Sequence, residues 1–280
     1  MNAGLCDLVV TNPLAPAPIR AIVLYPTLAP TSGVEIGPYH FDTTRDAPLA
    51  DGIWPLCLIS HGGGGSHLLY RSIATDLARH GLVVVCVEHP GDHRGDRSLT
   101  GTDQAALTRP AHVSRVLDAM LADTRFGACI AREEISIVGH SMGGYTALAL
   151  LGGQPWTRRA QPLPVQADAR IGRGVLLAPA TDWYRAPGAL NAVTAPLLVV
   201  TGERDVVTPA AAIQQTLAHL PPHTPVSWCS VPDAGHFAFL TPFPAEMVKP
   251  DFPPSQDPPG FDRHQFHQAL PGIIRRFLSR

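Results

Sequence analysis

The amino-acid sequence predicts an α/β fold class, with a doubly wound, mostly parallel β-sheet flanked by helices. Short runs rich in β-branched residues alternate along the chain with longer stretches of helical periodicity. From residue 56 onward nearly all of the short runs are continuously apolar, which is typical of strands that helices cover on both faces. This order of elements favours parallel strands joined by right-handed crossovers.

The expected elements follow one another without an internal repeat. Strands are predicted at residues 21–25, 56–60, 82–87, 135–139, 175–178, 197–201 and 226–231. Helices are predicted at residues 69–80, 102–122, 142–151, 209–219 and 263–278, the last with one apolar face that should pack on the body of the protein. The first one or two strands can add antiparallel edges.

Two proline-rich segments, residues 154–164 and 242–259, are interpreted as surface loops at the mouth of a site. Helical and strand patterns resume directly after each of them, which is not typical of linkers between domains. We therefore expect a single domain over residues 1–280, with these segments as loop insertions.

The composition is that of a globular protein with a sizeable core. The chain has 280 residues, of which 45% are hydrophobic and 16% charged. Its 21 basic and 23 acidic side chains give a net charge of −2, and no basic stripe indicates a nucleic-acid partner. No apolar run reaches the roughly 18 residues of a membrane span. The composition carries no signal of an oligomeric state.

The compartment is inferred from the amino terminus and the cysteines. The first ten residues lack the basic and apolar regions of a signal peptide. The five cysteines are scattered without a Cys-x-x-Cys spacing, and two of them lie inside apolar runs. Both features favour reduced thiols and a cytoplasmic protein.

A glycine-flanked serine, in Gly-His-Ser-Met-Gly at residues 139–143, forms the first functional motif. An apolar predicted strand enters this motif and a stretch of good helix formers leaves it. In such a strand–turn–helix setting the nucleophile adopts a strained backbone conformation, and the glycines let strand and helix approach closely. We predict that Ser141 is a nucleophile exposed at the carboxyl end of its strand.

A second predicted strand runs into four glycines, in the segment CLISHGGGGS at residues 57–66. Acyl transfer places negative charge on the former carbonyl oxygen, which preorganised backbone N–H groups stabilise. We expect Met142 and Gly63 to supply these two donors, with Gly64 as the alternative to Gly63. A phosphate-binding loop competes, but no Gly-Lys-Ser/Thr ending follows. His61 is expected to hold this loop in place.

His236 is the predicted general base among the 13 histidines. A serine hydroxyl at neutral pH needs such a base to become a good nucleophile. His236 follows the last predicted strand directly, so its loop should pass over the turn that carries Ser141. The chain order Ser, Asp, His accompanies this kind of serine turn. His89, which follows another predicted strand on the same side, is a candidate for a supporting or pocket role.

Asp205 is the predicted carboxylate that orients the histidine and stabilises its charged form. It stands in Thr-Gly-Glu-Arg-Asp, just past a predicted strand and before a helix for which Thr208 and Pro209 are a suitable start. Two alternatives remain open. Glu203 lies two residues earlier, and Asp182 follows the preceding predicted strand.

With these residues in place, the chain resembles the α/β-hydrolase superfamily, and more narrowly the dienelactone-hydrolase-like and platelet-activating-factor-acetylhydrolase-like serine esterases. The resemblance extends from about residue 56 to the carboxyl terminus and rests on the segments SHGGGGS, RPAHV, GHSMGG, TGERD, AGHF and FDRHQFH. Two features depart from it. Dienelactone hydrolases carry a cysteine where this chain has Ser141, and the acetylhydrolases place their acid near the position of Asp182.

The resemblance implies a cofactor-free serine esterase that acts on a small-molecule ester through an acyl-enzyme. No His, Cys and Asp cluster has convincing metal-ligand spacing, so no metal is expected. The substrate-binding rim is predicted at Trp183 and Phe237, together with Tyr184 and Phe239, and would favour an uncharged or acyl-chain substrate. An amidase, peptidase or acyltransferase that uses the same three residues is the alternative.

Overall fold

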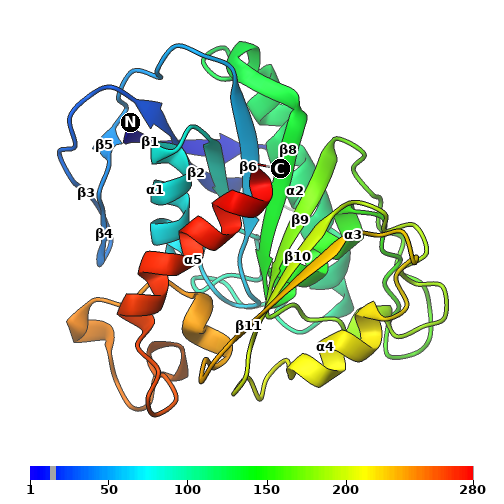
Figure 1. Ribbon diagram of the computed structural model, residues 1–280. Helices are drawn as coiled ribbons and strands as arrows, with labels where there is room; N and C mark the ends of the chain where they lie inside the picture. The colour runs from blue at the N-terminus through cyan, green and yellow to red at the C-terminus, as the bar shows by residue number, and fades with distance from the viewer. Residues whose placement is uncertain (13–16, 280) are drawn as a thin grey trace.

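The structure is a computed structural model that describes residues 1–12 and 17–279. In these residues a nine-stranded sheet has the order β11-β10-β9-β8-β6-β7-β2-β1-β5, and β3 pairs with β4 in a separate hairpin (Figure 1). The strands are β1 (Asn2–Val10), β2 (Ile19–Thr27), β3 (Val34–Ile36), β4 (Tyr39–Phe41), β5 (Thr44–Arg45), β6 (Trp54–Ser60), β7 (Val83–Val87), β8 (Ile130–His140), β9 (Ile171–Leu177), β10 (Leu197–Gly202) and β11 (Val226–Val231).

Strands β6 to β11 are parallel to one another, whereas β2 pairs antiparallel with both β7 and β1. The predicted α/β class with a mostly parallel sheet and antiparallel edges is therefore confirmed. The sequence did not reveal β1, because residues 2–10 contain Gly4 and Asp7 in place of a β-branched run. Gly4 is required there because a Cβ would overlap the ring of Tyr25.

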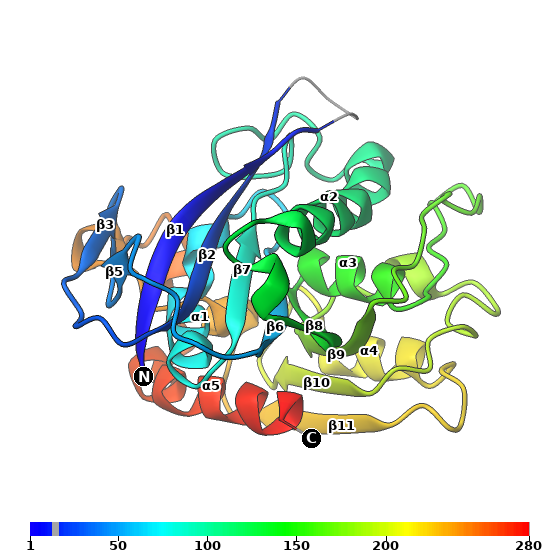
Figure 2. The ribbon, with the colours of Figure 1, turned by 90° about the horizontal axis from the view of Figure 1, so that it is seen from above.

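Helices cover both faces of the sheet, as Figure 2 shows from above. On one face, α1 (Arg71–Arg79) packs beside α5 (Arg263–Leu278). The other face carries α2 (Asp103–Ala122), α3 (Met142–Leu150) and α4 (Ala210–Leu217). Two hydrophobic clusters fill the two interfaces, so side chains of the central strands are buried on both sides. This burial explains the continuously apolar strands.

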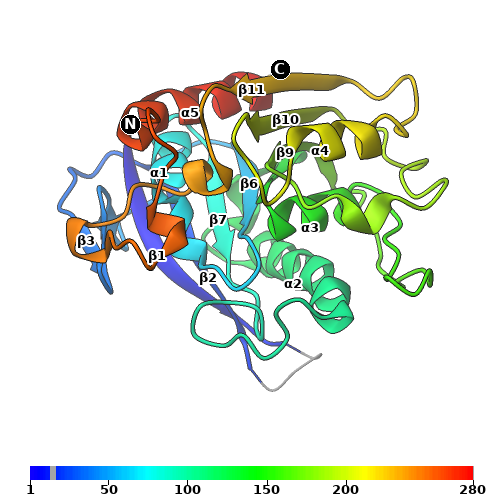
Figure 3. The same ribbon diagram turned by 90° about the horizontal axis from the view of Figure 1, so that it is seen from below.

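The loops that carry the predicted site residues all leave the same edge of the sheet. Strand β6 ends at Ser60, β8 at His140, β10 at Gly202 and β11 at Val231. Because these strands are parallel, their carboxyl ends meet at one edge, where ligands of open α/β sheets bind. Figure 3, seen from below, shows the orange segment that follows β11 crossing this edge.

None of the helices in the described part of the chain combines the length and the apolar character needed to cross a bilayer.

Candidate active site

The turn between β8 and α3 holds Ser141 in a strained conformation. Its backbone has φ 55° and ψ −118°, in a region that residues with side chains rarely adopt. The backbone is fixed on both sides: the Ser141 N–H donates to the Leu177 carbonyl at 3.0 Å, and its carbonyl accepts from Ala180 at 2.9 Å. A Cβ on Gly143 would fall on the carbonyl oxygen of Ser60, so only glycine lets α3 start this close to β6.

Three side chains from three separate loops meet at this turn. The Oγ of Ser141 lies 3.0 Å from Nε2 of His236, and Nδ1 of His236 lies 2.8 Å from Oδ2 of Asp205. The side chains of His236 and Asp205 are 5% and 0% exposed, so water competes little for these contacts. Since a carboxylate only accepts hydrogen bonds, the imidazole proton belongs on Nδ1, which leaves Nε2 free to accept from the serine.

Asp205 is held by donors on both of its oxygens. Oδ1 accepts from the backbone N–H groups of Val207 and Thr208, each at 2.8 Å, and Oδ2 lies 2.9 Å from the Thr208 hydroxyl. Burial alone would raise the pKa of Asp205, but His236 and these donors outweigh it and lower the pKa below its ordinary value. The carboxylate is therefore ionised beside the imidazole.

The two alternative acids lie elsewhere. The side chain of Asp182 is 73% exposed and pairs with Arg185 at 2.6 Å. Glu203 is exposed at the surface and contributes its backbone N–H to Val231. Neither carboxylate contacts His236.

His140 links the segment around His236 to the glycine loop, which is residues 62–65. Its Nε2 lies 3.0 Å from the carbonyl of His236, and its Nδ1 lies 3.0 Å from the hydroxyl of Tyr70. The Tyr70 oxygen in turn accepts from the N–H of Gly62 at 3.2 Å. Only the neutral ring protonated on Nε2 satisfies this chain. Burial, together with His236, lowers the pKa of His140 to about 3, which keeps the ring neutral.

Two backbone N–H groups stand beside the serine without a protein acceptor in the described part of the chain. They belong to Gly63, in the glycine loop after β6, and to Met142, at the first position of α3. A Cβ on Gly63 would lie 3.2 Å from Cγ of Met142, so the two residues are neighbours. The N–H of Gly64, by contrast, is engaged by Oδ1 of Asp92 at 2.7 Å.

A cavity of about 640 Å³ opens over these groups. Ser141 and His236 lie in its wall, and the remaining surface is mostly apolar. The lining residues are Gly62, Gly63, Gly64, Gly65, Leu69, Tyr70, Arg94, Arg97, Thr100, Gly101, His140, Ser141, Met142, Val207, His236, Phe237, Leu240, Phe252, Pro253 and Pro254.

Of the four aromatic residues expected at the rim, Phe237 lines this cavity. Trp183 does not: it lies beside a separate surface pocket with Trp156 and Arg185. Tyr184 is fully buried and donates to the Tyr145 carbonyl at 2.7 Å, and Phe239 is fully buried against the ring of His140. The sequence shows that an aromatic residue follows a strand, but it does not show which way the residue faces.

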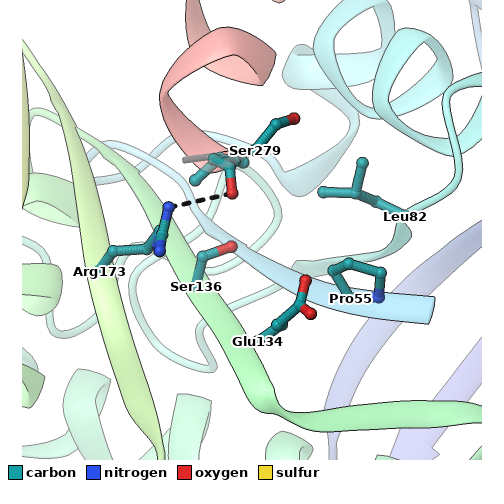
Figure 4. A pocket seen from close by; sticks show the side chains of 7 residues that line it. Pro55, Leu82, Glu134, Ser136, Arg173 and Ser279 are labelled. Carbon is teal, nitrogen blue, oxygen red and sulfur yellow. Dashed lines mark hydrogen bonds between the residues drawn. The ribbon is translucent and has the colours of Figure 1, made fainter. Parts of the chain in front are cut away.

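A smaller cavity of about 300 Å³ lies near the amino-terminal ends of β6 and β8 (Figure 4). The guanidinium of Arg173, from β9, lines this cavity but already has partners. It donates to the carbonyls of Phe277 and Leu278 at 3.1 Å each and so caps α5. This cavity is a packing feature at the end of α5. Nowhere in residues 1–12 and 17–279 do three or more His, Cys, Asp or Glu side chains form a group suited to a metal ion.

Sequence reasoning missed the contacts that Thr208 and Tyr70 make at the candidate site, and it named His89 only as a candidate. Thr208, proposed only as a helix cap, contacts both Asp205 and, at 3.1 Å, Nδ1 of His236. The pairing of Tyr70 with His140 joins residues 70 positions apart, so no local pattern could indicate it. His89 was considered for a supporting role. Its Nε2 lies 2.8 Å from Oγ of Ser60, and its backbone N–H donates to Nε2 of the loop residue His61.

Comparison with known proteins gives the fold a name. A family model described as the alpha/beta hydrolase fold matches residues 55–155. A ferulic acid esterase from Streptomyces cinnamoneus superimposes with a TM-score of 0.76 at 19% identity, covering 100% of this chain and 89% of that one. The chain therefore has the α/β-hydrolase fold.

The curated relatives are longer than this chain and match only part of it. The platelet-activating factor acetylhydrolase of Canis lupus familiaris is 25% identical over 150 residues, covering 38% of this chain and 34% of the relative. Cutinase est1 of Thermobifida alba is 23% identical over 194 residues, covering 68% of this chain and 56% of the relative. The chain thus spans between a third and somewhat more than half of these relatives. The resemblance to acetylhydrolases expected from the motifs is confirmed.

Proposed function

We propose that this α/β-hydrolase-fold protein is a serine esterase that cleaves small carboxylic esters through an acyl-enzyme on Ser141. The observation that carries the proposal is the continuous contact from Ser141 Oγ through His236 to Asp205, at 3.0 and 2.8 Å. A serine within reach of a base, which is itself oriented by a third group, is the arrangement that activates a hydroxyl nucleophile. The similarity to an acetylhydrolase and a cutinase supports ester chemistry.

The reaction follows from the positions of these groups. His236 Nε2 takes the proton as Ser141 Oγ bonds to the ester carbonyl carbon, and the carbonyl electron pair moves onto its oxygen. The N–H groups of Gly63 and Met142 stabilise this oxyanion. The intermediate collapses, the alcohol leaves with the proton from His236, and an acyl-enzyme remains. Water activated by the same base then releases the acid and regenerates Ser141.

Asp205 stabilises the charged imidazole in both steps without taking the proton itself. Its lowered pKa favours this division of roles, because the carboxylate stays ionised while the ring cycles. Phe237, Leu240 and Phe252 give the cavity an apolar side that suits an acyl chain. No cofactor enters these steps.

The test is hydrolysis of p-nitrophenyl acetate and butyrate by the wild type and by Ser141→Ala. We expect turnover by the wild type and a loss of roughly 10⁴- to 10⁶-fold in kcat in the variant, because the acyl acceptor is removed. A fluorophosphonate probe should label the wild type at Ser141 and leave the variant unlabelled. Full activity of Ser141→Ala would refute the proposal. A p-nitroanilide with the same acyl group separates an esterase from an amidase.

A further inference from the structure

A buried ion pair lies next to the site and has no part in the reaction described above. Arg109 of α2 is fully buried, and its Nη1 lies 2.6 Å from Oδ2 of Asp92, which is 1% exposed. Nε of the same guanidinium donates to the Thr146 hydroxyl at 3.1 Å. Burying two charges is costly, so a pair in this position is weak evidence for stability and needs another explanation.

The ion pair forms hydrogen bonds with the glycine loop on both sides of Gly63. Nη2 of Arg109 donates to the carbonyl of His61, and Oδ1 of Asp92 accepts from the N–H of Gly64 at 2.7 Å. The Gly63 N–H lies between these two anchored groups and donates to no protein acceptor in the described residues. Asp92 is held in turn by the Thr100 hydroxyl, which donates to Oδ1 at 2.7 Å.

Four consecutive glycines do not order themselves, because glycine has the largest conformational freedom of all residues. Without external anchors the peptide planes of this loop could rotate and point a carbonyl, instead of an N–H, at the serine. The Asp92 contact also occupies the Gly64 N–H, which removes it as a competing donor. A donor contributes most to catalysis when it is already in place before the charge develops.

We propose that Arg109 and Asp92 are positioning residues that hold the Gly63 N–H toward the developing oxyanion. This inference rests on the proposed function, and it adds a role for the Arg-Pro motif of α2 that the triad leaves unexplained. Neither side chain lines the cavity over Ser141, so neither contacts the substrate. The pair acts on the Gly63 N–H through the backbone of residues 61–64, while its contact with Thr146 joins it to α3.

A positioning role and a merely structural role predict different kinetics. Loss of the Gly63 donor weakens the transition state and leaves ground-state binding nearly unchanged, so kcat falls while KM stays. A trifluoromethyl ketone tests the same donor without turnover: Ser141 adds to its carbonyl carbon, the carbonyl electron pair forms an oxyanion, and His236 takes the proton. A structural role would lower only the number of folded active sites.

The experiment uses Arg109→Lys and Asp92→Asn, with p-nitrophenyl butyrate as substrate and active sites titrated to completion with a fluorophosphonate. Lysine keeps the charge but cannot reach Asp92, Thr146 and the His61 carbonyl together. We expect kcat per titrated site to fall roughly 10- to 100-fold with KM changed less than about threefold. The inhibition constant of a butyl trifluoromethyl ketone should rise by the same factor.

The matched control is Asp168→Asn, which breaks a carboxylate–arginine pair with Arg170 far from the glycine loop. It should lower the melting temperature without changing kcat per titrated site. Should the Arg109 and Asp92 variants fail to fold, Thr100→Val removes only one donor to Asp92 and should lower kcat about two- to fivefold with a parallel rise in the inhibition constant. Unchanged kcat and inhibition in a folded variant would overturn the positioning role, whereas an inactive wild type would overturn the esterase itself.

Discussion

At the scale of single residues, the candidate acids differ in their burial and in the protein groups that donate hydrogen bonds to them. Asp205 accepts from two backbone N–H groups and lies next to a hydroxyl and the imidazole, whereas Asp182 is open to solvent. Both follow a parallel strand in the same half of the sheet, so their sequence contexts look alike. The difference is the Asx-type turn formed by the residues after Asp205, which aims its second oxygen at His236.

This difference predicts unequal effects of the two Asp→Asn substitutions. Asp205→Asn keeps the shape but presents an amide that favours the wrong imidazole tautomer, so kcat should fall by roughly 10³- to 10⁴-fold. Asp182→Asn should leave kcat within about twofold, because surface ion pairs contribute little. Both are measured with p-nitrophenyl butyrate at pH 8. An active Asp205→Asn beside a crippled Asp182→Asn would exchange the two roles.

At the scale of elements, the segment between β7 and α2 has two tasks. Asp92 points inward to the ion pair, while Arg94 and Arg97 line the cavity over Ser141. The guanidinium of Arg97 lies against the glycine loop, since a Cβ on Gly64 would come within 2.7 Å of its Nε. Among the described residues of this wall, these two arginines are the only side chains that carry a permanent charge. The wall therefore has a positive potential and no carboxylate to balance it.

This potential predicts a preference between substrates of equal length. p-Nitrophenyl adipate, which ends in a carboxylate, should lose about two- to fivefold in kcat/KM in Arg97→Gln, because the exposed guanidinium interacts modestly through water. p-Nitrophenyl heptanoate, which is neutral, should be unaffected. Added salt should reduce the adipate rate in the wild type by screening. As a control, Arg158→Gln alters an arginine of a separate pocket. Equal losses for both esters would contradict the electrostatic argument.

The elements that could be predicted from the sequence are those with a local apolar run or a helical periodicity. Strands β6 to β11 and helices α1 to α5 were found because buried apolar runs and helix starts leave local patterns. The proline-rich loop after β11 was predicted near the site, but the side chains that hold this part of the chain come from α5. Arg263 of α5 reaches Asp257 at 2.7 Å and the carbonyl of Pro254 at 2.8 Å, and His267 reaches Ala238 at 2.9 Å.

The arrangement of the candidate site could be predicted where it depends on local backbone requirements. The glycine-flanked turn of Ser141 and the glycine before His236 are local requirements of backbone geometry, so they appear in the sequence. The pair of Arg109 with Asp92, the pair of Tyr70 with His140 and the direction of Trp183 depend on the packing of segments far apart in the chain. A single sequence holds no direct record of such contacts.

At the scale of the whole molecule, five histidines are enclosed in the folded state as neutral rings. Burial is the main cause of their lowered pKa values, which fall from the ordinary 6.5 to about 4 for His112 and His267 and about 3 for His140. Burial, together with the charge of Arg109, also lowers the pKa values of His61 and His89 well below the ordinary value. In the unfolded chain these histidines become protonated near pH 6.5, whereas in the folded protein they become protonated only at a much lower pH.

The sign of the pH dependence follows from this difference. Because the unfolded state binds more protons below pH 6.5, the free energy of unfolding falls as the pH falls. The slope is set by a difference of up to five bound protons between the two states. Between pH 6.5 and pH 5 each histidine lowers the free energy of unfolding by about 1.6 kcal/mol, so five lower it by roughly 8 kcal/mol, which is comparable to the total stability of a typical domain. Paired carboxylates such as Asp205 act in a lower window, near pH 4 and below.

We therefore expect the protein to be stable at pH 7 to 8 and to unfold cooperatively close to pH 5. Urea midpoints measured at half-unit steps from pH 8 to pH 5 should give a slope that approaches five protons between pH 6 and pH 5. His112→Leu should reduce this slope by about one proton, because the buried ring of α2 is removed. Ile213→Val, a core change without a titrating group, should lower stability by about 1 kcal/mol at every pH and leave the slope unchanged. A flat profile down to pH 5, or equal slopes for wild type and His112→Leu, would show that these rings are protonated in the folded protein.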